Sequence, residues 1–115
     1  MNPVFINIYD AAKKYNACIP GLRAIEIAND EEDYLSHKDI RTFAYWITIK
    51  EPELAYLRKS YNNNIMNAMN KLDEIISPSS SHSPEDITNA WNEYNKIREN
   101  EIEQLLYSVK EYYKR

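Results

Sequence analysis

The chain has 115 residues, a formal net charge of −4, one cysteine and one glycine. This length predicts a single domain with one core, and no apolar run approaches the length of about 18 residues that a membrane helix requires. Neither half of the chain carries a surplus of basic residues, which argues against non-specific binding of nucleic acid. One glycine leaves little provision for the turns of a many-stranded β fold or for a phosphate-binding loop.

The N-terminal segment contains no basic stretch followed by an apolar core. Such a stretch is typical of a secretory leader, so we expect a cytoplasmic protein. A lone cysteine is compatible with that expectation because it cannot form an internal disulfide.

Short helices are predicted for the first half of the chain. Residues 2–18 fit a helix because Phe5, Ile8 and Ala12 repeat at helical spacing. Residues 22–28 fit either a two-turn helix or a short strand. The sequence leaves this alternative open.

The next segment begins with residues 29–33, NDEED, which we interpret as an acidic turn. Apolar residues from Ile40 onwards have helical spacing, and Ser36 or Asp39 is expected to begin this helix. The run FAYWITI at 43–49 is rich in β-branched and aromatic residues, so a strand is the alternative there.

Two long amphipathic helices are predicted at 52–76 and 84–113, joined by the serine-rich loop 77–83. Ser83 is placed to cap the second helix, with Asp86 as its partner. In that helix, large apolar residues recur at intervals of three and four or their multiples: Ile87, Trp91, Tyr94, Ile97, Leu105, Val109 and Tyr112. The sequence therefore predicts an all-α fold, in which an antiparallel hairpin has its apolar face covered by two or three shorter N-terminal helices.

No residue pattern indicates catalysis, a metal or a cofactor. His37 and His82 are far apart and lack the spacing of a helical zinc site. Cys18 has no histidine near it in sequence, and we expect it to be a small buried hydrophobic residue at the end of a helix. We therefore expect a protein that is not an enzyme.

Protein–protein interaction is the favoured function. One candidate surface is an acidic segment without a basic residue, formed by Glu26, Asp30, Glu31, Glu32 and Asp33. The other is an aromatic and cationic cluster near the C-terminus: Tyr107, Tyr112 and Tyr113 with Lys110, Lys114 and Arg115. We expect an inhibitor, immunity or accessory protein of a bacterium or phage that binds a larger protein or nucleoprotein, with a homodimer through the C-terminal helix as a further expectation.

The alternative is a small helix-turn-helix-like DNA-binding regulator that dimerises through its C-terminal helix. Its reading helix would present Lys38, Arg41, Tyr45 and Lys50 to DNA. The acidic turn at 29–33 would then lie close to phosphates, which disfavours this alternative.

Overall fold

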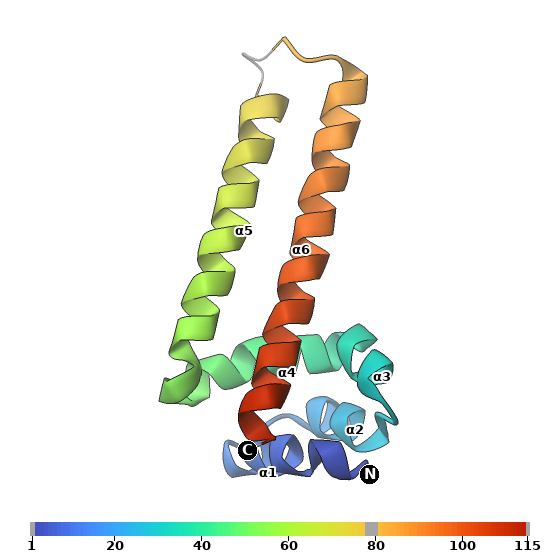
Figure 1. Cartoon of the computed structure of the whole chain (residues 1–115), viewed down its shortest axis with the longest axis vertical. Coiled ribbons are helices and arrows are strands. Elements are labelled where there is room, and N and C mark those ends of the chain that lie inside the picture. Colours follow the sequence, from blue (N-terminus) through green and yellow to red (C-terminus); the bar gives the residue numbers. More distant parts are fainter. Residues whose placement is uncertain (1, 78–80, 115) are drawn as a thin grey trace.

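The computed structural model describes residues 2–77 and 81–114, and 86% of these residues are helical. No strand occurs in these ranges, so the predicted all-α class is confirmed (Figure 1). Residues 78–80 of the predicted loop and Arg115 of the predicted basic cluster lie outside the described residues. The elements are the 3₁₀ turn η1 (Pro3–Phe5), α1 (Ile6–Lys14), α2 (Ile19–Ile27), α3 (Glu31–Ser36), α4 (Lys38–Lys50), the 3₁₀ turn η2 (Pro52–Leu54), α5 (Ala55–Ile76) and α6 (Pro84–Tyr113).

The molecule has a head and an arm. Helices α1–α4 gather at one end of the α5–α6 hairpin, around the start of α5 and the end of α6, and form the head (Figure 1). The rest of the hairpin, residues 62–76 and 84–100, extends away from the head as the arm. The longest extent is 52 Å against 27 and 23 Å, and the radius of gyration is 16.9 Å. A compact chain of this length would have a radius of gyration of about 13 Å.

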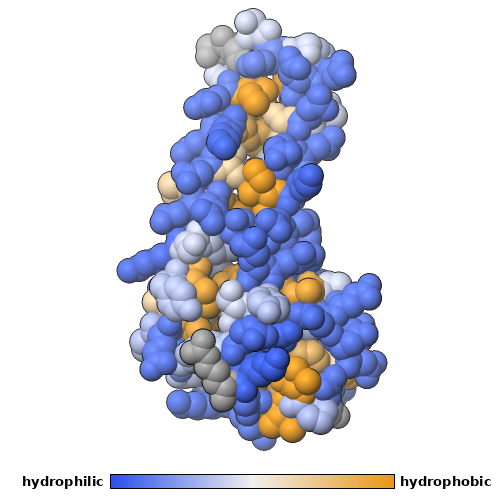
Figure 2. All heavy atoms as spheres, in the orientation of Figure 1, coloured by the Kyte–Doolittle hydropathy of each residue, from blue (hydrophilic) through white to orange (hydrophobic). Residues whose placement is uncertain are grey.

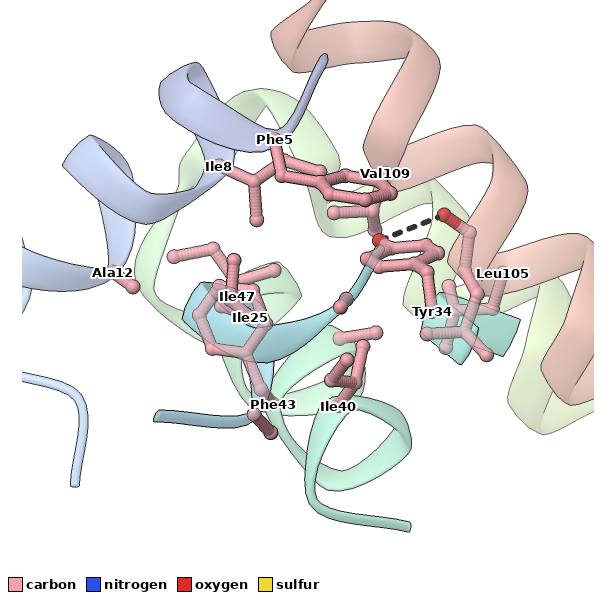
Figure 3. Packing of buried hydrophobic residues seen from close by; sticks show 14 of the residues in the cluster. Phe5, Ile8, Ala12, Ile25, Tyr34, Ile40, Phe43, Ile47, Leu105 and Val109 are labelled. Atoms are coloured by element: carbon pink, nitrogen blue, oxygen red, sulfur yellow. Dashed lines mark hydrogen bonds between the residues drawn. The ribbon is translucent and has the colours of Figure 1, made fainter. Parts of the chain in front are cut away.

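The core lies in the head, where Tyr34 of α3 is completely buried. Its ring stacks on Phe5 with 5.2 Å between centroids and 13° between planes. Its hydroxyl donates a hydrogen bond of 3.1 Å to the backbone carbonyl of Leu106 in α6 (Figure 3). The surrounding apolar side chains come from every helix of the head and from α6, and include Ile8, Ala12, Ile25, Ile40, Phe43, Ile47, Leu105 and Val109.

The interpretation of residues 29–33 as a turn is wrong, because Glu31–Ser36 form α3. Asp30 caps this helix by accepting a hydrogen bond of 2.9 Å from the backbone N–H of Asp33. The carboxylate of Asp33 in turn accepts one of 3.1 Å from the backbone N–H of Asn29. Negative side chains in the first turn also complement the helix dipole. The acidic run therefore stabilises a helix N-terminus.

The predicted start of α4 at Ser36 or Asp39 is also wrong. His37 is the N-cap, since its Nδ1 accepts a hydrogen bond of 3.1 Å from the backbone N–H of Asp39. The two segments left open between helix and strand are both helical: residues 22–28 lie almost entirely in α2, and 43–49 lie within α4.

The expected burial of Cys18 is wrong as well. Helix α1 ends at Lys14, and Asn16 adopts a left-handed backbone conformation with φ of 59°. Pro20 then lies in the first turn of α2, where a proline costs no hydrogen bond. Cys18 is consequently the exposed N-cap residue of α2, and does not close the first helix.

The hairpin was predicted well. Helix α6 has the predicted bounds, and its cap is present as a hydrogen bond of 3.2 Å from the backbone N–H of Asp86 to the hydroxyl of Ser83. The predicted helix 52–76 begins with the turn η2 and continues as α5. The N-terminal helices cover only one end of the hairpin, however, so the expectation that they cover its apolar face fails along the arm, where Trp91 is 44% exposed.

Candidate protein-binding surface

The acidic segment is largely engaged within the molecule. Glu31 accepts a hydrogen bond of 2.7 Å from the Nζ of Lys110, a buried lysine in the last part of α6. Asp30 and Asp33 make the capping hydrogen bonds described above. Glu26 and Glu32 are exposed and have no polar partner within residues 2–77 and 81–114. Two of the five predicted carboxylates are therefore free to meet a partner.

The C-terminal tyrosines have different environments. Tyr107 is half exposed, and the Nζ of Lys110 lies 5.0 Å from its ring centroid. Tyr112 donates a hydrogen bond to Glu53, which raises the pKa of Tyr112 to about 12. Tyr113 packs edge-on against Tyr112 at 4.9 Å between centroids, and burial raises its pKa. Tyr112 and Tyr113 thus hold the end of α6 against the head.

The predicted DNA-reading residues lie on α4, but two of them are occupied. The guanidinium of Arg41 donates to the Leu35 carbonyl at 2.9 Å and forms an ion pair of 2.8 Å with Glu99 of α6. The Tyr45 hydroxyl lies 3.2 Å from the side-chain nitrogen of Asn62 in α5. Lys50 lies over the ring of Trp46, 5.7 Å from its centroid, and Lys38 is exposed. These contacts bind α4 to both hairpin helices, which it crosses.

The sequence reasoning missed a surface on the arm, which we call the aromatic face. Trp91 and Tyr94 meet edge to face at 6.1 Å between centroids, and the guanidinium of Arg98 lies 5.7 Å from the ring of Tyr94. Met66 and Met69 are one turn apart on α5, and both are largely exposed. The aromatic face comprises Tyr61, Met66 and Met69 of α5 and Trp91, Tyr94 and Arg98 of α6.

Tyr61 joins the aromatic face to the head. Its ring meets Tyr45 of α4 edge to face at 5.7 Å between centroids. Burial raises the pKa of the Tyr61 hydroxyl, while the nearby positive charge of Arg98 acts in the opposite direction and Tyr94 adds to the increase. Tyr61 therefore lies within electrostatic range of both Tyr94 and Arg98, and aromatic rings follow one another from α4 along the arm.

The arm exposes this surface because two helices alone cover each other on one side only. Met66 is 61% exposed, Met69 is 47% exposed and Trp91 is 44% exposed. Among the described residues, none between 62 and 101 belongs to the head's core cluster. Figure 2 shows, on another face of the arm, hydrophobic side chains in the groove between α5 and α6 with hydrophilic ones on both sides. Helix α5 and α6 thus lack the third and fourth helices that would complete a bundle.

The concave sites of the head do not provide a cofactor or metal centre. A groove of about 600 Å³ lies between α2 and the start of α4, but His37 on its wall is occupied as the cap of α4. A second groove of about 370 Å³ is lined by Cys18, Asp39 and Trp46 among others. No three histidine, cysteine or acidic side chains come together in a metal-binding cluster anywhere in the described part of the chain.

No protein-family model, curated protein or solved structure matches this chain. Within residues 2–77 and 81–114, no helix combines the length and hydrophobicity that crossing a membrane requires. The aromatic face is therefore judged on its own geometry and chemistry.

Proposed function

We propose that this protein is a non-catalytic binding module that acts through protein–protein contact, with the aromatic face of the arm as its contact surface. The observation that carries this proposal is the exposure of Trp91, Met66 and Met69 on a two-helix arm that no other described helix covers. Large apolar side chains gathered on one exposed face are typical of an interaction site.

The residue types on the aromatic face support protein binding. Tryptophan, tyrosine and arginine are the side chains most enriched in binding hot spots, where truncation of one residue costs about 2 kcal/mol or more. Methionine adds a flexible apolar surface that adapts to a partner and makes favourable contacts with aromatic rings. Tyr61 and Tyr94 are packed against neighbouring rings, so they are already ordered before binding and lose little conformational entropy.

Within this class, a role as an inhibitor, immunity or accessory protein of a bacterium or phage fits the size and net charge of the chain. The end of the arm carries the exposed acidic residues Asp73, Glu74, Glu85 and Asp86. Glu26 and Glu32 add two free carboxylates on the head. A larger partner with a basic rim around an apolar groove would complement this distribution.

The test is affinity capture from a host lysate with three versions of the tagged chain: wild type, Trp91→Ala and Tyr56→Ala. Tyr56 is a matched control because it is 65% exposed on α5 and has no ring contact within the described residues. We expect one stoichiometric protein to be retained by wild type and Tyr56→Ala, and to be lost with Trp91→Ala. Equal retention by all three versions would contradict the proposal.

A further inference from the structure

The aromatic face has an uneven charge distribution that points to its occupant. Four exposed carboxylates lie at the far end of the arm, on Asp73 and Glu74 of α5 and on Glu85 and Asp86 of α6, and Lys71 is the nearest lysine or arginine. Closer to the head, Lys96 and Arg98 are exposed on α6. Arg98 and Asp73 form no ion pair within the described ranges, so each charge is available to a second molecule.

The spacing of these charges matches an antiparallel copy of the same arm. At 1.5 Å per residue, Asp73 lies roughly 5 Å from the tip of the arm and Arg98 roughly 21 Å from it. The arm from Tyr61 to Ile76 is roughly 23 Å long. When two arms are laid side by side in opposite directions, Asp73 of each copy therefore falls close to Arg98 of the other.

The same register brings the apolar residues together at the centre. Met69 and Trp91 both lie roughly 10 Å from the tip, near the middle of the arm, where a two-fold axis would pass. Each Trp91 would meet Met69 of the other copy, a favourable contact between sulfur and an aromatic ring. An isologous pairing of this kind uses one surface twice and closes after two subunits.

We propose that the occupant of the aromatic face is a second copy of this chain, and that the two arms pair in antiparallel orientation as a four-helix bundle with Asp73 of each copy against Arg98 of the other. This inference rests on the proposed function, because it names the partner of the same surface. Two arms of this size bury about 1,000 Å² in total, which is at the lower limit for specific interfaces. The dimer therefore dissociates on dilution.

The experiment is sedimentation equilibrium of the full chain over a range of micromolar concentrations. We expect the mass of the wild type to rise from 13.6 kDa towards twice that value. Asp73→Arg and Arg98→Asp each place like charges opposite one another and should raise the dissociation constant at least about tenfold, whereas the double variant restores opposite charges and should return to within about threefold of wild type. Circular dichroism of each variant checks that the helical content is unchanged.

Trp91→Ala and Tyr56→Ala form a second pair for the same measurement. Loss of dimerisation with Trp91→Ala but not with Tyr56→Ala supports the proposal. A wild-type chain that stays at 13.6 kDa at every concentration overturns it, as does a dimer that neither single charge change weakens. If the chain is a monomer, Trp91-dependent capture of a different protein assigns the face to that protein, whereas equal capture by wild type and Trp91→Ala removes the proposed function itself.

Discussion

Lys110 Nζ lies 2.7 Å from Oε1 of Glu31, and this contact ties the last part of α6 to the first turn of α3. The lysine side chain is only 9% exposed, whereas that of Glu31 is 51% exposed. Glu31→Gln would leave a buried ammonium without its charged partner, and we expect it to lower the free energy of unfolding by about 1–2 kcal/mol in urea denaturation.

Glu32→Gln is the matched control for that change. Glu32 is the next residue of α3, is exposed and has no polar partner within the described ranges. Its substitution should change the free energy of unfolding by less than about 0.5 kcal/mol. Equal effects of the two substitutions would show that the Lys110–Glu31 contact does not stabilise the fold.

Tyr34→Phe tests the buried hydrogen bond between α3 and α6. The phenylalanine keeps the stack on Phe5 but leaves the Leu106 carbonyl without its hydroxyl donor. We expect a loss of about 1 kcal/mol in the free energy of unfolding, measured by urea denaturation. Tyr107→Phe, at a half-exposed position without a hydroxyl hydrogen bond in the described structure, should have no measurable effect. A Tyr34→Phe variant as stable as wild type would contradict the assignment.

Alkaline pH should weaken the attachment of the end of α6. The pKa of Tyr112 is raised from 10.0 to about 12 because its hydroxyl donates to Glu53, so the folded state favours the neutral phenol. Glu51, Tyr15 and Tyr113 lie close by and act on it in the same direction. The stabilisation from this hydrogen bond is complete below pH 10 and is lost as the pH rises through about 12.

This prediction is checked by urea denaturation at about pH 8 and about pH 11. Wild type should lose more stability between the two pH values than Tyr112→Phe, which has no ionisable hydroxyl at this position. The comparison also separates Tyr112 from other groups that titrate in the same range, because those groups are common to both proteins. Identical losses in the two proteins would refute the role of the Tyr112–Glu53 contact.

The asparagine run in α5 offers a prediction about helix propensity. Asn62 bonds to Tyr45, and Asn64 donates to Glu101 of α6 at 3.1 Å. Asn63 is exposed and has no such contact in the described part of the chain. Asn63→Ala should therefore stabilise the protein by about 0.5 kcal/mol, because alanine is the better helix former. Thermal unfolding should show no comparable gain for Asn62→Ala or Asn64→Ala, and a gain of equal size at all three positions would contradict the two hydrogen bonds.

The fold was predictable where local signals agree. The apolar stripes of α5 and α6 and the cap at Ser83 are local features, and they located the hairpin closely. Helix α3 was missed although Asp30 and Asp33 have the spacing of a cap and its partner, because the acidic run was interpreted as a turn. The start of α4 was harder to predict because histidine is not among the preferred N-cap residues.

The aromatic face could not be predicted because it depends on where the head lies. Periodicity assigned Trp91 and Tyr94 to the buried stripe of the last helix. A stripe is buried only where other helices cover it, and the contacts of α4 with α5 and α6 hold the head at one end of the hairpin. These tertiary contacts leave Trp91 exposed and, in the same way, hold Tyr112 and Tyr113 against the head.

The central claim, that a second chain covers the aromatic face, is tested most directly by the fluorescence of Trp91. In a Trp46→Phe background Trp91 is the only indole, since the chain has two tryptophans. We predict that the emission of Trp91 shifts to shorter wavelength and becomes protected from iodide quenching as the protein concentration rises through the micromolar range. Emission and quenching typical of an exposed indole at every concentration would contradict the claim.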